Sequence, residues 1–177
     1  MKLALVLLAF WQFIRPTDPP TTRELHFAGG IAIVERQGDR EHVVIEDPNG
    51  IVQSDSYCDA QSGKYDDIVK LGEKVRTAAA FGDKALMASL GTYPLHVNLA
   101  STDAKGARAV KERSVLSQGE LVSYYSTYIT YNMSQQLRFM EPHDVFCRNG
   151  MSLLAGGLVW ATADRDGNVK IAIINQP

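Results

Sequence analysis

The sequence lacks long apolar runs and long runs of like charge. Its longest apolar run, Leu3 to Phe13, is interrupted only by Gln12 and holds about eleven residues, whereas a bilayer-spanning helix needs about 20. The formal net charge of the 177 residues is −2. A transmembrane anchor is therefore not predicted, and the chain lacks the basic patch typical of nucleic-acid binding or of attachment to an anionic membrane.

Cysteine is also scarce. Cys58 and Cys147 are the only two; they form no C-x-x-C motif, and no histidine stands at ligand spacing beside either one. We therefore predict no metal site. The two cysteines are candidates for one disulfide, and the alternative is two separate thiols packed as small apolar groups.

Motifs that carry known chemistry are missing as well. The sequence has no G-x-S-x-G segment, and the pairs Gly29-Gly30 and Gly156-Gly157 lack the spacing of phosphate-binding loops. The segment Asp164 to Asn168 is rich in calcium-type ligands, but it has neither the glycine position nor the glutamate of an EF-hand. We predict no cofactor, and an enzyme is the less favoured interpretation.

The N-terminus is typical of a secretory signal. Lys2 precedes the apolar run, and Arg15 to Pro20, with three prolines, cannot continue a helix. Residues 1–22 are interpreted as a signal peptide and linker, which predicts a periplasmic or secreted protein. The alternative is an apolar segment packed on the domain, because no small-x-small cleavage step follows the run directly. Export would place Cys58 and Cys147 in an oxidising compartment, where they are expected to pair.

Residues 23–177 have the length and periodicity of a single α+β domain. A β-hairpin is expected over 25–46, with a third short strand over 51–54. Apolar residues at helical spacing, Ile68, Leu71 and Val75, indicate a helix from about residue 64. Further elements are expected as helices at 84–90 and from 118 onward, and as strands at 93–99, 109–113, 144–147, 151–154, 158–163 and 169–175.

Three segments carry a resemblance to a known family: YPLHVN, SQGELVSYYSTY and DVFCRNGMSLLAGGLVWATADRDGNVKIAIIN. In this order they look like an NTF2-like (nuclear-transport-factor-2-like) domain of the exported bacterial type, over about residues 64–175. The resemblance implies helices packed on a strongly curved antiparallel sheet that forms a cone, here with an extra N-terminal β-hairpin. Because members of this superfamily include enzymes and non-catalytic proteins, the resemblance does not fix the function.

Six residues are candidates for ligand or partner binding. Tyr124, Tyr128 and Tyr131 share one face if residues 118–131 form a single helix. The other three candidates are Trp160, His96 and Asp144. Each of the six also has an ordinary structural interpretation, such as a core aromatic whose polar tip reaches a partner. His143 and Asp144 are adjacent, so on a strand they would point to opposite faces, and we assign no catalytic residue.

These observations lead to two hypotheses. The first is an exported, non-catalytic binding protein, inhibitor-like or immunity-like, acting on a partner protein or a small envelope ligand through the sheet face or the cone mouth near Trp160 and Tyr128. The alternative is a small isomerase, dehydratase or hydrolase that uses the cone as its pocket. The sequence does not fix the partner or the oligomeric state, for which a homodimer is one option.

Overall fold

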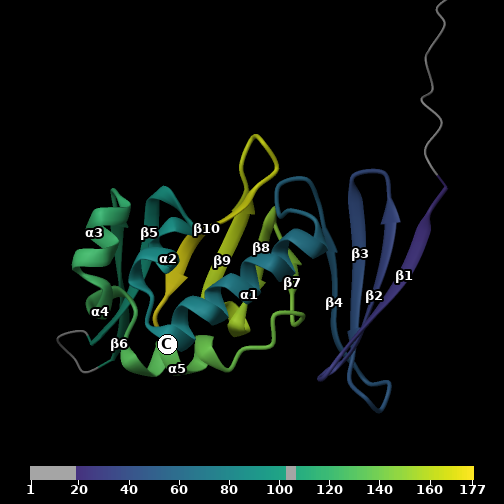
Figure 1. Ribbon diagram of the computed structural model, residues 1–177, viewed down its shortest axis with the longest axis horizontal. Coiled ribbons are helices and arrows are strands. Elements are labelled where there is room, and N and C mark those ends of the chain that lie inside the picture. The colour runs from purple at the N-terminus through teal and green to yellow at the C-terminus, as the bar shows by residue number, and fades with distance from the viewer. Residues whose placement is uncertain (1–18, 103–106) are drawn as a thin grey trace, which may run out of the picture.

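The computed structural model describes residues 19–102 and 107–177. Within these residues the chain is α+β: a four-stranded sheet stands beside a six-stranded sheet, and helices cover one face of the larger sheet (Figure 1). The expected signal segment falls on residues 1–18 and lies outside the described residues. No helix within the described ranges is long and apolar enough to cross a membrane.

The four-stranded sheet is an antiparallel meander in which each strand pairs with the next along the chain. Its strands are β1 (Thr21–Phe27), β2 (Gly30–Gln37), β3 (Arg40–Glu46) and β4 (Val52–Cys58). β1 begins inside the segment expected to be linker, and β4 runs four residues past the expected end at Ser54. The second half of β4 was not predicted because the buried positions of the strand are Ser54, Ser56 and Cys58, so its alternation carries little hydropathy signal.

The long helix is α1 (Tyr65–Phe81), and it has the predicted apolar face. It ends at Gly82, whose positive φ of 63° suits a glycine at a helix C-terminus. Asp83 then caps α2 (Lys84–Ser89), because its carboxylate accepts a hydrogen bond from the Leu86 amide at 2.8 Å.

The prediction of a single tyrosine-bearing helix from residue 118 onward is wrong. The structure has three short helices there, α3 (Gln118–Ser123), α4 (Tyr125–Tyr128) and α5 (Tyr131–Arg138). Tyr124 and Ile129 leave helical geometry, and the Thr130 hydroxyl accepts a hydrogen bond from the Met133 amide to start α5. A threonine cap inside a helical pattern therefore ends one helix and opens another.

The six-stranded sheet is mixed, whereas the sequence predicted an antiparallel one. Its order is β6-β5-β10-β9-β8-β7, and β10 pairs with β5 in parallel. The strands are β5 (Gly91–Thr102), β6 (Arg108–Val115), β7 (Phe146–Arg148), β8 (Met151–Leu154), β9 (Val159–Ala163) and β10 (Val169–Asn175), with a 3-10 turn at Ala155–Gly157. The connection from β5 to β10 includes helices, so it is long enough for parallel pairing.

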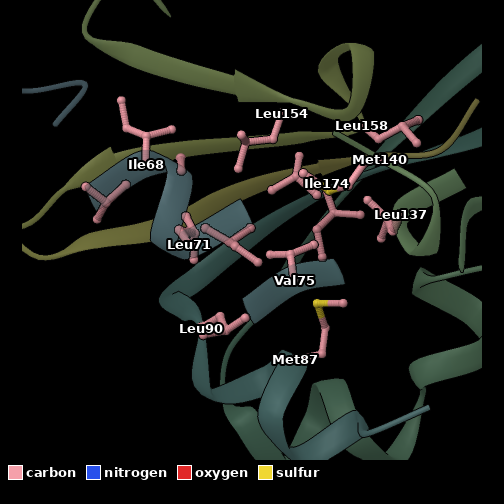
Figure 2. Packing of buried hydrophobic residues seen from close by; sticks show 14 of the residues in the cluster. Ile68, Leu71, Val75, Met87, Leu90, Leu137, Met140, Leu154, Leu158 and Ile174 are labelled. Carbon is pink, nitrogen blue, oxygen red and sulfur yellow. The ribbon is translucent and has the colours of Figure 1, made fainter. Parts of the chain in front are cut away.

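The main core lies between the helices and one face of the six-stranded sheet. Figure 2 shows Ile68, Leu71 and Val75 of α1 directed toward Leu154 and Ile174 of the sheet. All five are at most 4% exposed. Met87 from α2 and Leu137 from α5 complete the same cluster. The helix-facing side of the sheet is therefore filled by packed apolar side chains.

A disulfide and two serine hydroxyls join the two sheets where β4 runs beside β7. Cys58 and Cys147 are bonded, with their Cα atoms 5.1 Å apart, which confirms the predicted pairing. The Ser54 hydroxyl donates to the Val145 carbonyl at 3.2 Å, and the Ser56 hydroxyl accepts from the Cys147 amide at 3.1 Å. We call these five residues the seam.

Candidate functional site

One register row crosses all six strands of the larger sheet. Strand pairing places one residue of each strand opposite the next, in the order Phe146, Leu153, Trp160, Ile173, His96 and Ser114. Directly opposed residues point to the same face, and each of these side chains is partly or fully exposed. Their strand neighbours Leu154, Val159 and Ile174 are buried against the helices. The row therefore marks the face that points away from the helices, which we call the outer face.

An apolar groove occupies the β7–β9 end of the outer face. It has a volume of about 330 Å³ and is lined by Phe146, Arg148, Asn149, Met151, Leu153 and Trp160. The Trp160 indole N–H donates to the Gly157 carbonyl at 2.9 Å, which holds the ring at the groove wall. An apolar concavity with a few fixed polar groups is the usual form of a ligand site.

Arg148 gives the groove one positive charge. Its side chain is exposed, and no carboxylate of the described residues lies within ion-pairing distance of it. The following turn, Asn149-Gly150, has positive φ at both residues, as a tight hairpin turn requires. Gly150 has a φ of 72°, which favours glycine, and a Cβ there would also displace the Gln61 side chain, whose oxygen would stand 2.5 Å from it. This turn fixes Arg148 and Met151 as a facing pair beside the groove.

The three candidate tyrosines do not form one surface. Tyr128 is 1% exposed, and its hydroxyl donates to the Glu120 carboxylate at 3.3 Å. Burial raises the pKa of that hydroxyl. Tyr124 is exposed and its ring meets the edge of the Tyr128 ring, while Tyr131 is 81% exposed on the next helix. The expected shared face fails because the helix is broken at Tyr124 and Ile129.

The other three candidates divide between two places. Trp160 and His96 lie in the same outer-face row, with Ile173 between them. Asp144 lies in the loop before β7 and does not line the groove. Its neighbour His143 stacks on Phe27 at 4.8 Å between ring centroids and contacts the Tyr65 hydroxyl at 3.2 Å. His143 thus links β1 and α1 to the loop before β7, which is a structural role.

Sequence reasoning missed most of the groove, although it found Trp160. Phe146, Arg148, Met151 and Leu153 were not singled out. Strand alternation is the signal that could have found them. The buried residues Cys147, Ser152 and Ala161 occupy the inner face of β7, β8 and β9, so the residues on either side of each of them point to the face of Trp160.

A polar cluster, separate from the groove, lies around His42 on the four-stranded meander. The His42 Nε2 atom is 2.8 Å from the Asp55 carboxylate and its Nδ1 atom 3.5 Å from that of Glu35. The ring also stacks on Tyr57 with centroids 4.5 Å apart. The hydrogen bond to Asp55 is the main reason why the pKa of His42 is raised, and Glu35 adds to it. With a carboxylate beside each ring nitrogen, the protonated form of the ring is favoured.

No metal centre accompanies these groups. Across the part of the chain that the structure describes, no cluster of three or more histidine, cysteine, aspartate or glutamate residues could hold a metal ion. Comparison with known proteins adds no relative: no family model matches, and neither the curated proteins nor the solved structures contain a significant match. The geometry of the chain itself is therefore the basis for a functional proposal.

Proposed function

We propose that this protein is an exported, non-catalytic binding protein of NTF2-like architecture that holds a partner protein in the outer-face groove. The observation that carries the proposal is the groove itself, in which Trp160 and Phe146 stand beside Arg148, whose guanidinium has no carboxylate partner among the described residues. Aromatic and arginine side chains dominate the binding energy of protein interfaces. The matching partner segment has an apolar side chain next to a carboxylate.

Export is supported by two independent features. The apolar N-terminal run after Lys2 is typical of a secretory signal. The Cys58–Cys147 disulfide is the kind of bond that persists in oxidising compartments. Together they support a periplasmic or secreted location.

The NTF2-like assignment is supported by element order. Helices α1 and α2 precede a hairpin, β5–β6, and a four-strand meander, β7–β10, closes onto β5. In this arrangement the helices cover one face of the sheet, and the meander of β1–β4 is an addition to it (Figure 1). The assignment leaves the function open, so the groove carries the functional argument.

The enzyme alternative needs a polar pocket between helices and sheet. That space holds instead the packed side chains of Ile68, Val75, Leu154 and Ile174. His96 lies on the opposite, outer face. These positions favour binding over catalysis.

The test uses peptides as probes. A short synthetic peptide that ends in leucine with a free carboxylate is titrated into the oxidised protein while tryptophan fluorescence is followed. We expect a saturable change in the wild type, and about tenfold weaker binding in Arg148→Gln, because a charge-assisted hydrogen bond is lost. The same peptide with an amidated C-terminus should bind as weakly to the wild type as the free acid binds to Arg148→Gln.

Two controls make the test specific. Arg165→Gln removes an equal charge from the exposed β9–β10 turn and should leave binding unchanged. Trp160→Ala, shown to be folded by circular dichroism, should lose peptide binding when the titration is followed calorimetrically. Unchanged binding by this variant would refute the groove. Turnover of an isomerase, dehydratase or hydrolase substrate that is abolished by His96→Gln would replace the proposal with the enzyme alternative.

A further inference from the structure

The meander of β1–β4 has one face that packs on the rest of the protein and one that does not. Ala32, Val34, Val43 and Ile45 point inward and are at most 4% exposed. The alternate residues point outward. Pairing aligns them in three rows: Thr22, Glu35, His42 and Tyr57; Glu24, Ile33, Val44 and Asp55; His26, Ile31, Glu46 and Val52. We call these twelve residues the meander face.

The charge of the meander face is mainly negative. Its three rows carry four carboxylates, Glu24, Glu35, Glu46 and Asp55, and the next outward residue of β3 beyond His42 is Arg40, which offsets one of them at the end of the sheet. His42 offsets part of this charge when protonated, because it pairs with Glu35 and Asp55. The second histidine, His26, is 3.9 Å from Glu24. Such a face attracts cationic partners and repels anionic ones.

Apolar side chains are interspersed with these carboxylates. Ile33 and Val44 are half-buried between Glu24 and Asp55 in the middle row. Tyr57 is 64% exposed and Val52 52%. Acidic and apolar groups thus occur within one cross-strand distance of each other, which suits lysine or arginine side chains of a partner, because their aliphatic stems can contact the apolar groups while their charged ends reach the carboxylates.

The outer edge of β1 is unpaired within the part of the chain that the structure describes. β1 is the terminal strand of its sheet, and no strand of the described residues pairs with its outer side. It has seven residues and neither proline nor lysine, and its one arginine, Arg23, is held by Asp66 at 2.7 Å. Natural edge strands are usually protected by such residues or by bulges, and an unprotected edge is a template for an added strand.

From these observations we propose that the β1 edge binds an extended, cationic segment of a partner protein by strand addition. The added strand would pair its backbone with β1. Its lysine or arginine side chains would stand opposite Glu24 on the meander face, within reach of Glu35 on the next strand. This surface lies on the smaller sheet and is separate from the groove, so the proposal does not depend on the proposed function.

The test is an NMR titration of the ¹⁵N-labelled, oxidised protein. The probe is a synthetic peptide of alternating lysine and valine, and its partner control has glutamate in place of lysine. We expect the lysine peptide to shift the amide signals of β1 and β2, and binding to weaken at high salt. The glutamate peptide should cause no shift. Equal binding of both peptides, or shifts confined to the six-stranded sheet, would overturn the proposal.

Variants of the protein and of the peptide distinguish the contribution of charge from that of backbone pairing along β1. Glu24→Lys combined with Glu35→Lys should weaken binding of the lysine peptide about tenfold, because like charges would then face each other across the strands. Glu112→Lys, a single charge reversal of the same kind on exposed β6 of the other sheet, should have no effect. A lysine peptide methylated on every backbone nitrogen keeps its charge but has no N–H group to donate to β1, and it should not bind.

Two further results would count against the proposal. Full binding of the methylated peptide would mean that charge alone is recognised and that β1 adds no strand. Concentration-dependent shifts of β1 amides without peptide, with a dimer in sedimentation experiments, would mean that a second copy of this chain covers the edge.

Discussion

The two sheets of this protein are stabilised in different ways. The six-stranded sheet buries large apolar residues such as Leu154 and Ile174 under a layer of helices. The meander buries mostly smaller ones, such as Ala32, Val34 and Val43, and two of the three inward positions of β4 are serine. The meander must therefore be held by specific bonds more than by buried area, because hydrophobic stabilisation scales with the apolar surface removed from water.

Those bonds lie at the seam and at the start of α1. The buried carboxylate of Glu41 on β3 accepts from the Tyr65 amide at 2.7 Å, at the N-terminus of α1. The Tyr65 hydroxyl in turn donates to the His143 carbonyl at 3.2 Å. In the meander, a disulfide and buried hydrogen bonds thus take the place of the helical layer that stabilises the larger sheet. Four predictions test this difference between the two sheets.

The largest effect is expected from removing the disulfide. Cys58 and Cys147 are 89 residues apart, and the chain-entropy model gives a loss of about 4.6 kcal/mol when a loop of this length is opened. Cys58→Ala with Cys147→Ala should therefore lower the free energy of unfolding by about that amount in a denaturant titration. Hydrogen exchange should show β1–β4 opening before the larger sheet. A reducing agent should weaken the wild type and leave the variant unchanged.

The second-largest loss of stability is expected from substitutions in the core of the larger sheet. Leu154→Ala should cost about 3 kcal/mol, because its side chain is 0% exposed and the cavity cannot collapse fully. Leu153→Ala, one residue away on the outer face, should cost about 1 kcal/mol or less, since that side chain is only partly buried. Equal losses for the two variants, measured by thermal unfolding, would contradict the assignment of the two faces.

A smaller effect is expected at Glu41. Glu41→Gln keeps the shape but removes the negative charge that caps the N-terminus of α1, and we expect a loss of about 1 kcal/mol. Glu46→Gln, a change of the same kind on the meander face, serves as the control and should be nearly neutral. If both variants unfold at the same denaturant concentration, the attachment of β3 to α1 contributes little.

The smallest effect concerns pH. The pKa of His42 is raised from about 6.5, mainly by its hydrogen bond to Asp55, so the folded state binds the proton more tightly than the unfolded state. The resulting stabilisation is fully present below pH 6.5 and is lost as the pH rises through the raised pKa of the folded state. The stability difference between wild type and His42→Gln should therefore shrink as the pH increases through this range. NMR titration of the ring would measure the pKa directly.

Much of the local structure could be predicted from the sequence. The face of α1, the Asp83 cap and the hairpin turn at Asp164–Asn168 each depend on neighbouring residues, and each is present. The disulfide was also predicted, on the condition that the protein is exported to an oxidising compartment, and the structure contains it. Trp160 and His96 were selected as candidates, and the structure places both on the outer face.

The missed features depend on residues far apart in the chain. The parallel pairing of β10 with β5 joins Asn175 to Asn98, and no local pattern encodes it. Tyr128 and Trp160 were expected near one cone mouth, but the helices cover the side of the sheet opposite to Trp160. Arg148 was missed because its role depends on the groove that Phe146 and Trp160 form beside it.

The seam also sets the geometry between the two sheets. A backbone ladder between β4 and β7 would join ten strands into one sheet, which would have to share a single accumulating twist. The hydroxyl groups of Ser54 and Ser56 replace that ladder with bonds that tolerate rotation. Each sheet can therefore keep its own twist, with the Cys58–Cys147 bond as a fixed pivot. Substitutions at Ser54 and Ser56 are expected to change the angle between the groove and the meander face while leaving the residues of both surfaces intact.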